Sequence, residues 1–202
     1  AKLAKEFDVL VISDEIHAPL SWVPFTPYLS LGQEAAATGV TITSSSKAWN
    51  TAGLKAGFLV TASDQVRAKL KLLPEAMQWR ASILGAHAMV AAYEQGVGWL
   101  DQTVLQLQEN LEHLRSEVAN RLPQARLYEM EATYLAWVDV SGTGMSLQEA
   151  IYRVQKRAKI AVNHGPTFGT GGESFLRFNI GTQRANVTRA VAAMQEAFSD
   201  LQ

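Results

Sequence analysis

The stretch from Gly39 to Lys47 reads Gly-Val-Thr-Ile-Thr-Ser-Ser-Ser-Lys, a run rich in β-branched residues followed by three hydroxyl side chains and a lysine. Such a run favours a strand buried on both faces, which is typical of a parallel sheet. Lys47 therefore follows a buried strand, at the place where open α/β sheets bind their ligands. A desolvated amine there can condense with an aldehyde, although the same residues also suit a lysine exposed in a turn.

Two further strands are expected, one before and one after this segment in the sequence. Val9–Ile12 is a short apolar run that ends at Ser13 and Asp14, and Gly57–Thr61 is a third apolar segment. Residues 32–37 are weakly helical, so helix and strand alternate as in an α/β layered domain. We predict that all three strands are buried.

The middle of the chain is helical. Ser63 predicts an N-cap for a helix over residues 64–72. A longer helical stretch covers about 78–122, and Gly96 and Gly98 are expected to break it in two. Apolar residues recur every three or four positions in its second part, which predicts one buried face made of Leu100, Val104, Leu107, Leu111, Leu114, Val118 and Leu122.

The last third of the chain changes to a mixture of short strands and helices. The expected elements are a strand at 134–139, a helix at 147–159 with Ser146 as its N-cap, a short strand at 160–162, an alternating strand at 175–180 and a last helix at 186–201. Because these elements form a second set of strands and helices, we expect a domain boundary near residues 95–120.

Composition excludes several classes of protein. The 202 residues are 48% apolar and 18% charged, with a net charge of -1, so a packed core is expected and a nucleic-acid partner is not. No apolar run is long enough to cross a membrane, and the first seven residues do not resemble a signal peptide. There are no cysteines, and the four histidines lack metal-ligand spacing, so we expect no disulfide and no metal site.

Three polar clusters follow the apolar strands and are the candidate site. The segment 13–17 contains Asp14 and His17; a buried carboxylate there would need a cation, but alone the segment favours a helix cap or a surface loop. Ser44 and Ser46, with Lys47 and Lys55, suit a phosphate group or an ordinary turn. Arg177 interrupts an apolar strand, as a bidentate carboxylate clamp or a structural ion pair does.

Taken together and in order, these motifs resemble the fold-type I pyridoxal-phosphate (PLP) enzymes related to aspartate aminotransferase, and most of all their cystathionine β-lyase, or C-S lyase, branch. The matching segments are Val-Ile-Ser-Asp-Glu-Ile-His at 11–17, Thr-Ser-Ser-Ser-Lys-Ala-Trp-Asn-Thr-Ala-Gly-Leu at 43–54, Gly-Pro-Thr-Phe-Gly at 165–169 and Phe-Leu-Arg-Phe-Asn at 175–179. Many aminotransferases carry a tyrosine where His17 stands. The resemblance covers nearly the whole chain.

The resemblance implies a role for each candidate residue. Lys47 would be the catalytic residue that forms the aldimine with pyridoxal 5'-phosphate and then moves protons through a quinonoid intermediate. The other cofactor-binding residues would be Asp14 at the pyridine nitrogen, His17 near the phenolic oxygen, and Ser44, Ser46 and Lys55 at the phosphate. Lys55 stands where many relatives have an arginine, which leaves its role less defined. Arg177 would bind the carboxylate of the amino-acid substrate.

The implied fold is α/β: the carboxy-terminal part of a PLP-binding large domain over residues 1–100, with a mostly parallel sheet, a bridging helix to about 122, and a small α+β domain over 123–202. Relatives are much longer at the amino terminus, where elements that hold the cofactor belong. We therefore expect the chain to be a fragment that exposes a sheet edge and an apolar face, and that alone has little activity. The full-length form is expected to be a cytoplasmic homodimer.

Several functions remain open at this stage. The expected reaction is a C-S β-lyase reaction that releases a thiol, pyruvate and ammonia. An aminotransferase of the same fold is the first alternative, because both reactions begin with the same residues. A non-catalytic fragment that does not bind PLP is the second. A Schiff-base aldolase is the weakest, because it requires a closed barrel of eight strands.

Overall fold

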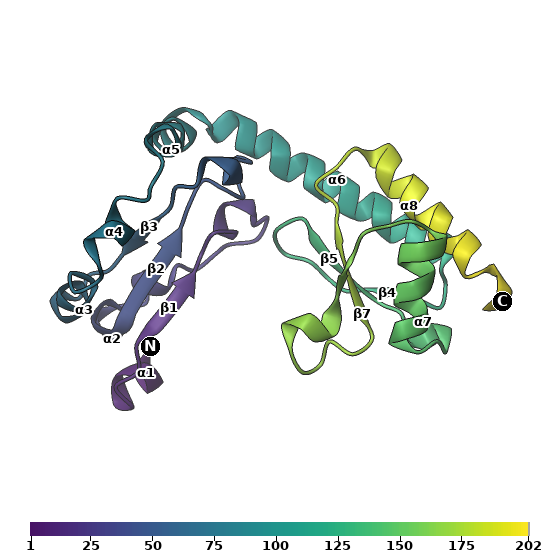
Figure 1. Cartoon of the computed structure of the whole chain (residues 1–202), viewed down its shortest axis with the longest axis horizontal. Coiled ribbons are helices and arrows are strands. Elements are labelled where there is room, and N and C mark those ends of the chain that lie inside the picture. Colours follow the sequence, from purple (N-terminus) through teal and green to yellow (C-terminus); the bar gives the residue numbers. More distant parts are fainter. Residues whose placement is uncertain (202) are drawn as a thin grey trace. The chain divides into compact units, whose positions relative to one another are not determined.

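The computed structural model describes residues 1–201, which divide into two compact units (Figure 1). The first unit is Ala1–Thr103 and the second begins at Val104. The boundary falls within the longest helix, α6, which spans Val97–Arg121. Each unit has an open sheet of its own, with three strands in the first and four in the second, so no closed barrel exists among the described residues and the aldolase alternative is wrong.

The sheet of the first unit consists of β1 (Val11–Asp14), β2 (Gly39–Thr43) and β3 (Phe58–Val60), in that order. Strand β1 runs parallel to β2, and Asp14 lies opposite Ile42. Strand β3 runs antiparallel to β2, with Leu59 opposite Ile42. The parallel pair expected from the apolar runs is therefore present, while the third strand reverses direction.

One face of this sheet is open to solvent, so the prediction that all three strands are buried is wrong. Ile12 is 61% exposed, Ile42 is 37% exposed and Leu59 is 48% exposed. Paired residues share a face of a sheet, so these side chains flank Asp14 on a single surface. The described residues supply no layer to cover it, and an apolar run by itself does not reveal whether a covering layer is present.

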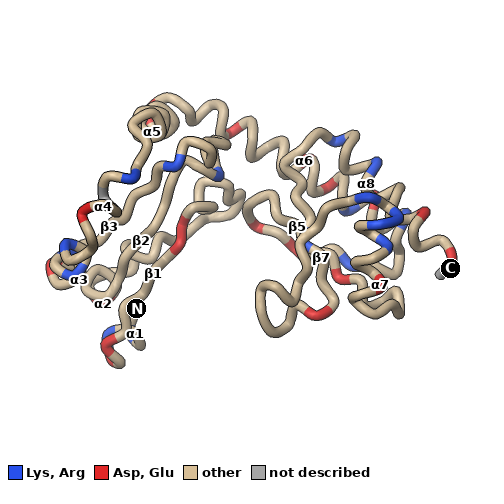
Figure 2. Tube along the Cα trace, viewed as in Figure 1, with Lys and Arg blue, Asp and Glu red and all other residues tan. Residues whose placement is uncertain are grey.

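The helices of the first unit are α1 (Lys2–Glu6), α2 (Gln33–Thr38), α3 (Asp64–Leu70), α4 (Glu75–Gln78) and α5 (Ile83–Gln95). Ser63 caps α3 as predicted, because its hydroxyl accepts a hydrogen bond from the backbone of Val66 at 3.3 Å. The long helical stretch breaks at Gly96, as expected, but Gly98 lies inside α6. In Figure 2, β2 and β3 carry no charge, and the charged residues of this unit gather on helices and strand ends.

The second unit contains an antiparallel sheet in the order β4-β5-β7-β6, made of Arg126–Leu127, Leu135–Asp139, Phe175–Asn179 and Asn163–His164 respectively. The short strand was expected at 160–162 and instead forms three residues later. The backbone N–H of Ile160 still bonds to Val154 at the end of the preceding helical segment, and Lys159 adopts a left-handed conformation with φ of 58°. Residues 160–162 therefore lead out of a helix and do not join the sheet.

Three helices accompany this sheet: the second part of α6, then α7 (Leu147–Tyr152), which continues as a π-helical turn over Arg153–Arg157, and α8 (Arg184–Ala197). Helices α6 and α8 lie side by side, since His113 bonds to Thr188 at 2.7 Å and Arg121 to Gln195 at 3.0 Å. The predicted apolar face is confirmed at Leu107, Leu111, Leu114, Val118 and Leu122, which are all buried, whereas Leu100 and Val104 are only half-buried. Among residues 1–201 no helix combines the length and apolar character that a membrane span needs.

One buried polar side chain joins α6 to the end of β7. The amide of Asn110 is 1% exposed and donates to the carbonyl oxygens of Ile180 at 2.9 Å and Thr182 at 2.7 Å. These bonds satisfy two carbonyl groups just beyond the last ladder bond of the strand.

We expect Asn110→Ala to lower the free energy of unfolding of the second unit by about 3 kcal/mol, because it removes both bonds of this bridge and leaves the carbonyl oxygen of Ile180 buried without this donor. Asn120→Ala, on an exposed position of the same helix, is the matched control and should cost less than about 1 kcal/mol. Hydrogen exchange of the amides of β7 measures both. Equal protection in the two variants would show that the Asn110 bridge contributes nothing.

Candidate functional site

Asp14 is the last residue of β1, at the carboxyl end of the parallel pair. It is exposed, and its Oδ1 accepts a hydrogen bond from the backbone of Ile16 at 3.1 Å. His17 follows at the start of a short 3-10 helix, Ala18–Leu20, and is half-buried. A carboxylate and an imidazole thus stand at the end of the strand, in the loop predicted from the sequence.

Glu15 holds this loop in place, a role that sequence reasoning missed. Its carboxylate is buried, and Oε1 accepts hydrogen bonds from the hydroxyl of Ser13 at 3.0 Å, the backbone of Tyr28 at 2.8 Å and the hydroxyl of Thr41 at 3.3 Å. Successive residues of a strand point to opposite faces, so Glu15 turns inward where Asp14 turns outward. The alternation of side chains between the two faces of a strand, counted from Asp14, was the one signal in the sequence that could have identified the inward position of Glu15.

We expect Glu15→Ala to lower the free energy of unfolding of the first unit by about 2–3 kcal/mol, because three donors lose a shared buried acceptor. Residues 13–28 should then exchange their amides faster, and the Asp14 loop should lose its fixed conformation. Glu6→Ala, at an exposed position of α1, provides the control. Unchanged exchange over 13–28 in Glu15→Ala would contradict this role.

Lys47 lies in a single turn directly after β2. The turn is closed by a hydrogen bond from the backbone of Trp49 to the carbonyl of Ser45 at 3.0 Å. The lysine is half-buried, and within the described residues its ammonium group makes no hydrogen bond or ion pair. The amine is therefore available to a ligand.

Ser44 precedes this turn, Ser46 lies within it and Lys55 follows it in the chain, and the three differ in accessibility. The Ser44 hydroxyl is 4% exposed, lies 2.6 Å from the Ser46 hydroxyl and donates to the carbonyl of Ala56 at 2.6 Å. Ser46 is half-buried, and Lys55 is exposed, with a left-handed backbone at φ of 54°. Ser44 would have to exchange its bond to Ala56 before it could bind a phosphate, whereas Ser46 and Lys55 are the accessible members.

Arg177 lies on β7 in the second unit, opposite Trp137 of β5 and Asn163 of β6. One guanidinium nitrogen donates to the Asn163 side chain at 3.0 Å, and the carbon Cζ lies 4.3 Å above the ring centroid of Phe168. Its Nε is buried and has no hydrogen-bond partner. An unpaired buried N–H of an arginine is unfavourable, but this atom is closed to solvent, so a carboxylate ligand would bind the outer nitrogens of the guanidinium.

Aromatic residues fix the surroundings of this arginine. The ring of Trp137 meets that of Phe168 edge-on at 5.2 Å and that of Phe175 at 5.6 Å. Burial raises the pKa of the Tyr134 phenol, and the positive charge of Arg177 offsets part of the rise. The guanidinium is thus stacked, partly desolvated and close enough to Tyr134 for its charge to act there.

The sequence-predicted residues fall into two groups. The first unit contains Asp14, His17, Ser44, Ser46, Lys47 and Lys55, on two adjacent strands and the loops that follow them. Arg177 belongs to the second unit.

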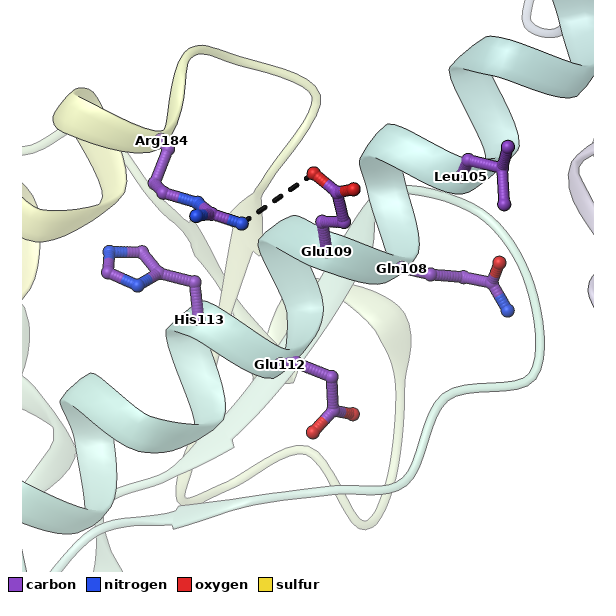
Figure 3. A pocket seen from close by; sticks show the side chains of 6 residues that line it. All are labelled: Leu105, Gln108, Glu109, Glu112, His113 and Arg184. Atoms are coloured by element: carbon purple, nitrogen blue, oxygen red, sulfur yellow. Dashed lines mark ion pairs between the residues drawn. The ribbon is translucent and has the colours of Figure 1, made fainter.

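The second unit also has a surface pocket that none of these residues lines. It lies along α6 and the start of α8, and is lined by Leu105, Gln108, Glu109, Glu112, His113 and Arg184 (Figure 3). Glu109 and Arg184 form an ion pair across it at 3.6 Å. Its charges are of both signs and mostly exposed, so it offers no concentrated site for one kind of ligand.

Comparisons with known proteins connect this geometry to a family. Cystathionine beta-lyase PatB of Bacillus subtilis is 32% identical over 205 residues, which cover 98% of this chain and 52% of that protein. Cystathionine beta-lyase of Corynebacterium glutamicum is 33% identical over 185 residues, which cover 90% of this chain and 49% of that protein. A crystal structure of the PLP-bound C-S lyase from Staphylococcus hominis has a TM-score of 0.86 at 27% identity, and the match covers 98% of this chain and 52% of that structure.

The chain spans about half the length of the curated relatives it matches. The solved structure confirms the predicted α/β fold class, and the relatives confirm the resemblance that the ordered motifs indicated. The model of the family aminotransferase class I and II matches residues 1–194, nearly the whole chain. The chain therefore belongs to the aminotransferase class I and II family.

Proposed function

We propose that the whole protein is a PLP-dependent enzyme that acts on amino acids and cleaves the bond between Cβ and sulfur. One observation carries this proposal: the parallel register of β1 and β2 sets Asp14 and the Lys47 turn at the same edge of one sheet. Relatives with 32–33% identity that bear the name cystathionine beta-lyase support the choice of reaction. The overall conversion would be amino acid thioether and water to thiol, pyruvate and ammonia.

The residues of the first unit fit pyridoxal phosphate by the chemistry of their side chains. An aldehyde requires an amine that is free to react, and Lys47 makes no competing contact among the described residues. A phosphate monoester requires hydroxyl and cationic donors, which Ser46 and Lys55 offer at accessible positions. A protonated ring nitrogen requires a carboxylate, and within residues 1–201 the Asp14 carboxylate accepts one hydrogen bond, from the backbone of Ile16.

These residues would hold the cofactor and leave Lys47 in position to work on the substrate. When bound, PLP supplies an electron-accepting ring that stabilises negative charge next to the amino nitrogen. Asp14 would keep the ring nitrogen protonated, and Lys47 would remove the proton from the substrate Cα. Arg177 would bind the substrate carboxylate through the outer nitrogens of its guanidinium, which fixes the orientation of Cα.

The reaction itself can be tested on the whole protein with L-cystathionine and added PLP. We expect thiol and pyruvate to appear in equal amounts, because elimination releases one of each. Glutamate formed from 2-oxoglutarate without thiol release would instead support the aminotransferase alternative. Neither product, in the presence of PLP, would support the non-catalytic alternative and contradict the proposal.

We further propose that the 202-residue chain alone binds PLP weakly and has little activity. The chain spans about half of its relatives, and the sheet face around Asp14 is open, so water competes for the same groups. A homodimer and a cytoplasmic location remain predictions of the family resemblance.

A further inference from the structure

The turn that carries Lys47 is too short to be stable by itself. It consists of Ser45–Trp49 and is closed by one backbone hydrogen bond of 3.0 Å. A single helical turn fixes several dihedral angles for one bond, which is unfavourable in isolation. Contacts from outside the turn must therefore impose its conformation.

Trp49 anchors the end of the turn to helix α5. Its indole N–H donates to the carbonyl of Gly96 at 2.9 Å, and its ring lies 4.8 Å from that of Tyr93. A Cβ atom at Gly96 would lie 2.5 Å from the indole nitrogen, so the absence of a side chain permits this approach. The bond joins residues 47 positions apart in sequence, just two residues after Lys47.

Thr51 anchors the beginning of the turn. Its hydroxyl lies 2.7 Å from that of Ser45, which is 2% exposed. Asn50 stands between the two anchors with φ of 54°, a left-handed conformation that asparagine adopts more readily than most residues. The two hydrogen bonds flank this residue, and together they determine the path of the chain away from Lys47.

We propose that Trp49, together with Thr51, is a positioning residue for Lys47. Their hydrogen bonds fix the lysine turn before any ligand binds, so the amine is presented in one direction. A preorganised amine reacts faster than one that samples many orientations. This inference rests on the proposed function, because it assigns a purpose to the turn that the cofactor amine would use.

The test uses the whole chain with three variants. Trp49→Phe and Thr51→Val each remove one hydrogen bond and keep most of the packing, and Trp79→Phe is the matched control, since Trp79 is 76% exposed. Hydrogen exchange of residues 45–49, measured without cofactor, should become about tenfold faster in the first two variants and stay unchanged in the control. Circular dichroism shows whether each variant is folded. If Trp49→Phe does not fold, the result for Thr51→Val decides the test.

The second measurement concerns the amine. The chain is incubated with millimolar PLP and reduced with borohydride, and the ratio of label at Lys47 to label at Lys55 is determined by peptide mass spectrometry. We expect this ratio to fall about fivefold in Trp49→Phe and Thr51→Val and to remain unchanged in Trp79→Phe. A residue that only stabilised the unit would leave the ratio unaltered.

Two results would overturn the proposal. Unchanged exchange over 45–49 in both variants would mean that the anchors do not hold the turn, and faster exchange with an unchanged label ratio would mean that the turn does not position the amine. Failure of the proposed function has a different signature, since the unsubstituted chain would then show no preference for Lys47. That outcome removes the positioning role as well.

Discussion

Lys47→Arg is expected to abolish covalent attachment of PLP at this position and to reduce turnover by on the order of 10²-fold or more. Arginine keeps the positive charge but provides no amine that condenses with an aldehyde at neutral pH. The loss would therefore come from chemistry and not from a change in charge. Absorbance of the bound cofactor and the rate of pyruvate release measure the two effects.

Lys5→Arg is the matched control for this change, because Lys5 is exposed on α1 of the same unit. It should leave both the absorbance and the rate unaltered. If Lys47→Arg retained the cofactor absorbance and the rate, another amine would be the reactive one and the site assignment would be wrong.

Arg177→Met is expected to lower kcat/KM for amino-acid substrates by about 10²- to 10³-fold, mostly through a higher KM. The guanidinium of Arg177 is held by Asn163 and stacked on Phe168, so a carboxylate ligand gains a charge-assisted bond that methionine cannot replace. Arg189→Met, at an exposed position of α8, is the control and should have little effect.

A second readout of Arg177→Met does not depend on activity. The charge of Arg177 lowers the pKa of Tyr134, against the rise that burial causes. Removing the cation makes the phenolate less favourable, so the Tyr134 pKa should rise further. NMR titration of the Tyr134 ring measures this shift, and an unchanged pKa would mean that the two groups do not interact.

Local signals in the sequence predicted those parts of the fold that local interactions determine. The strand at Gly39–Thr43 follows from its β-branched run. The caps at Ser63 and Ser146 follow from hydroxyls that each accept a hydrogen bond from the backbone N–H three residues later. The buried face of α6 follows from the recurrence of apolar residues every three or four positions. These features require no knowledge of distant parts of the chain.

Features that depend on distant contacts escaped prediction. The direction of β3, the open face around Ile12 and the place of β6 depend on which segments meet in space. The role of Glu15 depends on donors 13 and 26 residues away along the chain. The candidate residues themselves were found because their order along the chain resembles a known family, not because any one of them is distinctive alone.

The most direct test of the central claim is to map the amine that reacts with PLP. The chain is incubated with millimolar PLP, reduced with borohydride, digested and analysed by mass spectrometry, and the label at each of its lysines is compared. We predict a yellow adduct before reduction and the largest share of label on Lys47. A label spread evenly over exposed lysines, or concentrated on any lysine other than Lys47, would contradict it.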